Sequence, residues 1–158
     1  MHPTAAHVQA LLQALGVEAE VIEFAASTRT SAEAAAVIGT SVAQICKSIV
    51  FNMAGQALLV MASGADRIAV ARLEALMGQP LGKANAAFVR EQTGYAIGGV
   101  APIGHARQFP VLVERGLLQF PVVYAAAGTP NTIFAITPAD LLRITGAQVV
   151  DCRETPDS

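Results

Sequence analysis

The strongest constraint on the fold is a pair of apolar runs, Ile45 to Asn52 and Ala57 to Ala62, separated by the turn Ala54-Gly55. Apolar runs of this length around a glycine-containing turn predict two buried strands joined as a hairpin. Segments with helical spacing lie on both sides of this hairpin. The chain therefore has a β centre with helices before and after it.

The other elements follow from apolar spacing, helix caps and turn residues. Helices are predicted at Thr4 to Leu15, Thr30 to Gly39, Asp66 to Met77, Asn85 to Thr93 and Thr137 to Ile144. Strands are predicted at Val21 to Phe24, Phe109 to Val113, Val122 to Ala126, Thr132 to Ile136 and Val149 to Cys152. Several strands are joined by turns of hairpin length, which argues against a doubly wound parallel sheet and for an α+β fold with a mixed, strongly curved sheet.

Composition limits the classes of protein to which the chain can belong. Its 158 residues fit one domain spanning 1–158, and 53% hydrophobic against 14% charged residues excludes disorder. Some apolar residues are left for the surface, so a homodimer is one expectation. No apolar run reaches about 20 residues and the N-terminus has no signal-peptide pattern, so we expect no membrane span and a cytoplasmic protein.

Charge and the metal-binding residue types narrow the expected partners. A net charge of −2 argues against a broad basic face, so an RNA partner would be held by its end. The three histidines are scattered, and two cysteines, Cys46 and Cys152, are too few for a zinc site or a disulfide scaffold. We expect buried thiols, no metal and no cofactor, because Walker and dinucleotide motifs are also absent from the sequence.

Two segments carry the candidate chemistry. Lys47 is a cation inside an apolar strand, and it either reaches water or is held for a ligand. Gly98, Gly99, Pro102 and Gly104 stand close together in an otherwise apolar stretch. Glycine pairs often serve turns, but they also allow backbone N–H groups to approach a bound molecule. Together the segments suggest a cation facing backbone donors.

The run SAEAAAVIGTSVAQICKSIVF, followed about fifty residues later by GYAIGGVAPIGH, resembles the YbaK/EbsC family. The resemblance extends from about Val17 to Cys152. It implies a partly closed mixed sheet with helices packed around it. It also implies a free-standing aminoacyl-tRNA deacylase, related to the editing insert of bacterial prolyl-tRNA synthetase, that binds the 3′ end of aminoacyl-tRNA. Prolyl-tRNA synthetase itself is a further candidate partner.

The resemblance assigns roles to the two segments. Lys47 would bind a phosphate or ribose oxygen of the terminal adenosine, and the N–H groups of Gly98 and Gly99 would hold the ester carbonyl oxygen. Pro102 would fix the loop. Ser48 is expected on the opposite face of the strand, outside the site.

Several further residues have both a structural and a functional interpretation. Thr30 and Ser31 are first of all helix caps, and only the resemblance places them at a pocket mouth. His105 is a base, an RNA contact or an ordinary surface residue. Ala127 and Gly128 belong to the turn that lines the aminoacyl pocket in the family. Because 131–134 lacks the acid of the cysteine-selective branch, a pocket for a small aliphatic residue such as alanine is expected.

The leading hypothesis is a trans-editing hydrolase that cleaves the ester of mischarged tRNA, with proline tRNA carrying a small residue such as alanine as the expected substrate. Cys46 is a weaker candidate nucleophile, because neighbouring strand residues face opposite ways and no histidine lies nearby in sequence. One alternative is a non-catalytic module that binds an aminoacyl-tRNA end or a nucleotide. Another is a hydrolase of small esters or amides.

Overall fold

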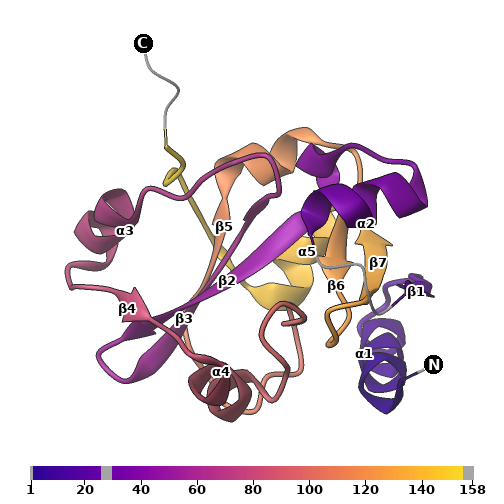
Figure 1. The fold of residues 1–158 in the computed structure, drawn as a ribbon, viewed down its shortest axis with the longest axis horizontal. Helices are drawn as coiled ribbons and strands as arrows, with labels where there is room; N and C mark the ends of the chain where they lie inside the picture. The colour runs from indigo at the N-terminus through magenta and orange to yellow at the C-terminus, as the bar shows by residue number, and fades with distance from the viewer. Residues whose placement is uncertain (1, 26–29, 155–158) are drawn as a thin grey trace.

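A computed structural model describes residues 2–25 and 30–154, and within them helices surround two β-sheets (Figure 1). The larger sheet has the strand order β4-β2-β3-β5-β8, and the smaller one has the order β1-β7-β6. Strand β2 is antiparallel to both of its neighbours, β3 and β4, whereas β5 runs parallel to both β3 and β8. The larger sheet is therefore mixed, as the sequence predicts.

The central hairpin consists of β2 (Cys46–Met53) and β3 (Gln56–Ser63). Its turn residues, Ala54 and Gly55, have positive φ angles of 54° and 91°. Such turns match the right-handed twist of the strands they connect. The predicted hairpin is confirmed, in a register that pairs Cys46 with Ser63.

The remaining strands of the larger sheet are β5 (Val111–Glu114), β8 (Gln148–Val150) and the two-residue β4 (Gly82–Lys83). The sequence did not predict β4, because two polar or small residues carry no strand periodicity. The smaller sheet contains β1 (Val21–Glu23), β6 (Val123–Ala126) and β7 (Thr132–Ile136). A single parallel bridge between Ile45 and Tyr124 links the two sheets. The sheets curve together without closing into a barrel.

The helices are α1 (Pro3–Ala14), α2 (Ser31–Ile38), α3 (Val70–Met77), α4 (Ala86–Thr93) and α5 (Pro138–Thr145). Short 3-10 turns cover Val42–Gln44 and Arg115–Gln119. Three predicted caps are confirmed, because Thr30, Asn85 and Thr137 each accept a hydrogen bond from the main-chain N–H three residues later.

Helix α3 begins at Val70, and the predicted start at Asp66 is wrong. The preceding residues pair with the C-terminal segment, since the Ala69 N–H donates to the Cys152 carbonyl at 2.7 Å and Ile68 bridges Arg153. These long-range bonds hold 67–69 outside the helix, and apolar spacing cannot reveal them. As a result, the Asp66 carbonyl is free of the helix and faces the hairpin.

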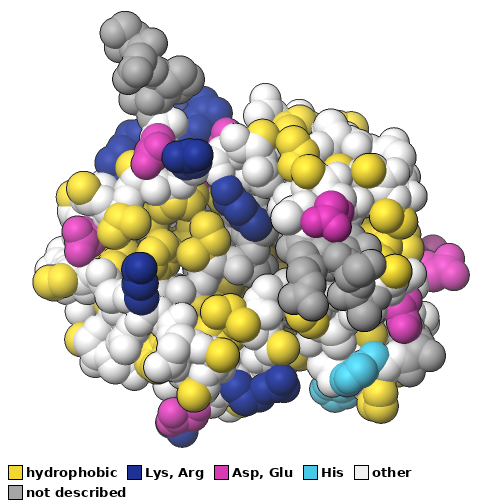
Figure 2. Space-filling view, viewed as in Figure 1, with side chains coloured by type: hydrophobic (Ala, Val, Ile, Leu, Met, Phe, Trp, Pro, Cys, Tyr) yellow, Lys and Arg dark blue, Asp and Glu magenta, His cyan; other side chains and the backbone are white. Residues whose placement is uncertain are grey.

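The main hydrophobic core lies between the sheets and α1, around fully buried side chains such as Leu12, Met61 and Phe134. Figure 2 shows hydrophobic side chains between α3 and the hairpin, and Lys and Arg side chains near the end of the described chain. There, Arg72 and Arg115 flank Asp151 at 3.6 and 3.5 Å. Within the described residues, none of the helices has the length and hydropathy needed to cross a membrane.

Candidate active site

A small cavity of about 210 Å³ opens beside the first residues of β2, where the two sheets approach each other. Strand β4 pairs only with Phe51 and Asn52, so it does not cover this end of β2. We call this space the Lys47 cavity. Its lining residues are Thr30, Ser31, Ala34, Ile45, Cys46, Lys47, Ser48, Gly98, Ala126 and Pro130.

Lys47 is partly buried, and its ammonium donates a hydrogen bond to the main-chain carbonyl of Asp66. Burial lowers the pKa of Lys47, the Asp66 carboxylate raises it, and the nearby Arg67 guanidinium lowers it. The side chain is therefore held inside the molecule and not extended into water. An ammonium has three donors, so two remain for a ligand oxygen.

Ser48 lines the same cavity as Lys47, and the prediction that it lies outside the site is wrong. Alternation separates neighbouring side chains when a cavity lies over one face of a sheet. This cavity lies at an uncovered edge, so side chains from both faces border it. The Ser48 hydroxyl is buried and has no hydrogen-bond partner within the described part of the chain.

The glycine-rich segment forms a closed loop over 94–105. Its base is fixed by two main-chain bonds of 3.0 Å, from Ala106 N–H to the Thr93 carbonyl and from Arg107 N–H to the Gln92 carbonyl. Inside the loop, the buried Tyr95 hydroxyl donates to the Ile103 carbonyl at 2.6 Å. Burial raises the pKa of Tyr95 to about 12, which keeps this donor protonated. The loop is thus anchored at its base and within its interior.

Gly98 and Gly99 have different positions in this loop. Gly98 lines the Lys47 cavity, and its φ of 85° suits glycine. Gly99 packs directly on the turn after β6, where an added Cβ would lie 2.6 Å from the Pro130 nitrogen. The structure therefore brings Gly98 to Lys47, while Gly99 fixes the approach of the loop to the neighbouring turn.

Ala127 and Gly128 do not line the Lys47 cavity. Ala127 is fully buried, and Gly128 adopts a φ of 100° beside α1, where a Cβ would lie 2.7 Å from Thr4 Cγ2. Their neighbours Ala126 and Pro130 form part of the cavity wall instead. This turn contributes to the site through its two ends.

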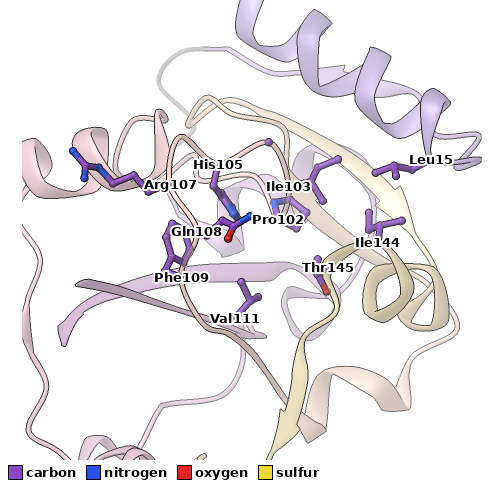
Figure 3. A pocket seen from close by; sticks show the side chains of 11 residues that line it. Leu15, Pro102, Ile103, His105, Arg107, Gln108, Phe109, Val111, Ile144 and Thr145 are labelled. Atoms are coloured by element: carbon purple, nitrogen blue, oxygen red, sulfur yellow. The ribbon is translucent and has the colours of Figure 1, made fainter. Parts of the chain in front are cut away.

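Pro102 and His105 lie in a different cavity, of about 520 Å³ (Figure 3). We call it the His105 cavity; its lining residues are Leu15, Pro102, Ile103, Gly104, His105, Arg107, Gln108, Phe109, Val111, Ile144 and Thr145. The His105 Nε2 lies 2.7 Å from the Ala101 carbonyl, and the ring centroids of His105 and Phe109 are 4.7 Å apart. Burial lowers the pKa of His105, while the bond to Ala101 raises it.

Thr30 and Ser31 reach the Lys47 cavity from the start of α2. The Thr30 hydroxyl is already engaged, accepting from the Glu33 N–H and donating to the Glu33 carboxylate, both at 3.1 Å. Cys46 also borders the cavity, but burial raises the pKa of its thiol to about 12. A protonated thiol is a poor nucleophile, which agrees with the expected buried role.

The residues that line the Lys47 cavity include a cation, hydroxyls and a glycine backbone, but no carboxylate or imidazole from the described chain. Elsewhere in the described residues, no three His, Cys, Asp or Glu side chains gather as a metal site would require. Such a cavity can position an oxygen-rich substrate and stabilise negative charge, but none of the described side chains that line it is suited to act as a general base.

The chain is similar to known proteins over most of its length. The model of the aminoacyl-tRNA editing domain family matches residues 25–144. An uncharacterized Bacillus subtilis protein, YwhH, is 34% identical over 133 residues, which are 84% of this chain and 85% of YwhH.

Two solved structures are also similar over nearly their whole length. A candidate trans-editing enzyme for prolyl tRNA synthetase is 44% identical, with a TM-score of 0.93 over 98% of this chain and 99% of that one. A protein from work on epitope backbone grafting onto scaffolds by computational design is 41% identical, with a TM-score of 0.93 over 98% of this chain and all (100%) of that one.

Proposed function

The chain belongs to the aminoacyl-tRNA editing domain family, and we propose that it hydrolyses the ester of mischarged aminoacyl-tRNA, with proline tRNA carrying alanine as the main substrate. The observation that carries this proposal is the meeting of Lys47 and Gly98 in one cavity, from segments far apart in the sequence. A cation beside a glycine backbone suits an ester that joins an amino acid to a ribose.

The proposed mechanism depends on positioning, because the described residues that line the cavity offer no general base. Lys47 binds a ribose or phosphate oxygen of the terminal nucleoside as a point charge. The backbone N–H of Gly98 is assigned to the carbonyl oxygen, which becomes negative when water attacks the carbonyl carbon. The Gly99 N–H, to which the family resemblance gives the same role, instead donates to the Ala96 carbonyl within the loop at 3.0 Å. The bond between this carbon and the ribose oxygen then breaks. The neighbouring ribose hydroxyl takes the proton of the water and passes it to the leaving oxygen, so the products are free amino acid and tRNA.

Cavity size supports a small aminoacyl group. Ala34 and Ala126 are the smallest side chains of the cavity wall, and the volume is about 210 Å³. This is below the roughly 300–1,000 Å³ of pockets that hold drug-sized ligands. We expect alanine to be accepted and proline excluded by its ring, with discrimination limited to what one or two methylenes supply.

The net charge of the chain bears on how it would bind tRNA. A net charge of −2 suits binding of the acceptor end more than the tRNA body, so we propose that tRNA identity is read there or with help from prolyl-tRNA synthetase. Aminoacyl-tRNA is used in the cytoplasm, and we place the protein there.

The deciding experiment is deacylation of proline tRNA charged in turn with alanine, cysteine, serine and proline. Wild type should hydrolyse the alanine ester of proline tRNA and leave the proline ester intact. Lys47→Ala should lower the rate on alanine by about 100-fold or more, as loss of a group that orients the reacting ester does. Lys83→Ala is the matched control, because Lys83 is the other lysine and lies exposed on β4.

Each rival predicts another result. A binding module would retain all four esters intact while still binding charged tRNA. A hydrolase of small esters would cleave free alanine ethyl ester as fast as alanyl-tRNA. A circular dichroism melt of Lys47→Ala keeps loss of activity separate from loss of folding.

A further inference from the structure

An apolar slot of about 270 Å³ adjoins the Lys47 cavity and shares two of its lining residues, Ser48 and Gly98. Its other walls come from β2, from α4 and from the glycine-rich loop, and they are Ile49, Val50, Val89, Ile97 and Val100. Because both spaces border the same serine and glycine, they lie next to each other.

Ser48 supplies the one side-chain polar group among the residues that line this slot. Its hydroxyl is buried and has no partner within the described residues. A buried polar group without a partner is costly, on the order of 1–3 kcal/mol, and such groups call for an explanation. A ligand with one polar edge among apolar surfaces would satisfy this hydroxyl.

Ile97 forms an apolar rim for the slot. It is 53% exposed and stands directly before Gly98 in the loop. The other apolar side chains that line the slot are buried or half-buried, whereas Ile97 is accessible to a ligand that lies across the opening. Its β-branched side chain offers a stiff apolar surface.

We infer that this slot binds the base of the terminal nucleoside at the acceptor end, an inference that rests on the proposed function. A nucleobase has two apolar faces and a polar edge, which match the apolar walls and the single Ser48 hydroxyl. Bound in this way, the base lies next to Lys47, which is assigned to the ribose or phosphate of the same nucleoside. The aminoacyl group then occupies the Lys47 cavity.

The aminoacyl side chain is the rival occupant of the slot. A methyl group such as that of alanine makes no hydrogen bond, so it would bury Ser48 without supplying the missing partner. It would also leave most of the 270 Å³ unfilled. The base fits both observations better.

The test is binding of 3′-deoxy-3′-(L-alanylamino)adenosine, a stable amide analogue of the ester, measured by isothermal titration calorimetry. Ile97→Asp should weaken binding by about 10-fold or more, because a charge replaces an apolar contact surface. Ser48→Ala should weaken it by about 3- to 10-fold. Leu76→Ala is the matched control, since Leu76 is 54% exposed but lies on α3, away from the slot, and it should bind as wild type does.

A second ligand isolates the base: the same aminoacyl ribose without adenine should bind wild type and Ile97→Asp equally. The inference is overturned if wild type does not bind the adenosine analogue, if Ile97→Asp binds it normally, or if both ligands weaken equally. Deacylation of alanyl-tRNA is measured in parallel. If binding depends on Ile97 but alanyl-tRNA is not deacylated, the base site is supported and the proposed function is refuted. If alanyl-tRNA is deacylated equally fast by wild type and Ile97→Asp, the proposed function is supported and the base site is refuted.

Discussion

The Lys47 cavity and the His105 cavity are built by one loop but differ in almost every other respect. Gly98 gives the first a wall without a side chain, whereas Pro102 and His105 give the second a wall of side-chain rings. The first contains a partly buried cation, and the second contains an imidazole whose hydrogen bond is satisfied within the loop. Neighbours in one glycine-rich motif can therefore border two different cavities, and within this loop only the Gly98 end faces the proposed reacting group.

The largest effect that would test this division is expected at Gly99, which fixes the loop on the turn at Pro130. Gly99→Ala places a Cβ 2.6 Å from the Pro130 nitrogen, and backbone cannot move aside easily. We expect a loss of about 3 kcal/mol in the free energy of unfolding and a deacylation rate lower by about 100-fold through displacement of the loop. Urea unfolding and single-turnover deacylation measure the two effects. Unchanged stability would contradict the packing role of Gly99.

Gly98→Ala should have a smaller and purely local effect. An added Cβ meets no atom within 4 Å, but the φ of 85° remains strained for alanine. We expect a cost of about 1–2 kcal/mol in stability. The methyl group would point into space used by the substrate, so kcat/KM for alanyl-tRNA should fall by about 10-fold. Equal losses for Gly98→Ala and Gly99→Ala would remove the distinction between the two glycines.

His105→Ala tests the other cavity and should separate stability from activity. Deacylation should stay within about 3-fold of wild type, because the imidazole does not reach the Lys47 cavity. Stability should fall by about 1–2 kcal/mol at neutral pH, because the contact with Phe109 and the bond to the Ala101 carbonyl are lost. Thermal melts and deacylation assays on the same preparation are sufficient. A loss of activity comparable to that of Lys47→Ala would unite the two cavities functionally.

The pH dependence of this variant provides a further check. Burial places the pKa of folded His105 below its unfolded value of about 6.5, so the unfolded state binds more protons between the two values. Wild type should lose stability as the pH falls through about 6.5 towards the lower folded pKa. His105→Ala should lose less over the same interval. Parallel curves for the two proteins would show that His105 does not titrate differently on folding.

The smallest effect is expected at Thr30, on the far wall of the Lys47 cavity. Thr30→Ala removes the cap of α2 and should cost about 1 kcal/mol, whereas Thr30→Ser keeps the hydroxyl and most of the stability. Activity should fall by about 3-fold in Thr30→Ala, because the helix start borders the cavity. If Thr30→Ser lost as much activity as Thr30→Ala, the methyl group and not the cap would be the important feature.

Local sequence patterns predict a structural feature correctly where the interactions that form it lie within a few residues of one another. The hairpin turn at Ala54 and Gly55 and the helix caps at Thr30, Asn85 and Thr137 were predicted in place. Their physical basis is a backbone angle or a hydrogen bond spanning three residues. Long-range pairing was not readable in this way, so the two-residue β4 and the true start of α3 at Val70 were missed.

For the candidate site, the sequence by itself determined that Lys47 and the glycine-rich loop are unusual, and it indicated the family. Tertiary structure alone decided that Gly98 joins Lys47 while Pro102 and His105 turn to another cavity, and that Ser48 lies at the site. Residue spacing fixes a side chain's direction within one element. Whether that side chain meets another segment depends on how sheet edges and loops pack, which is set by contacts distant in sequence.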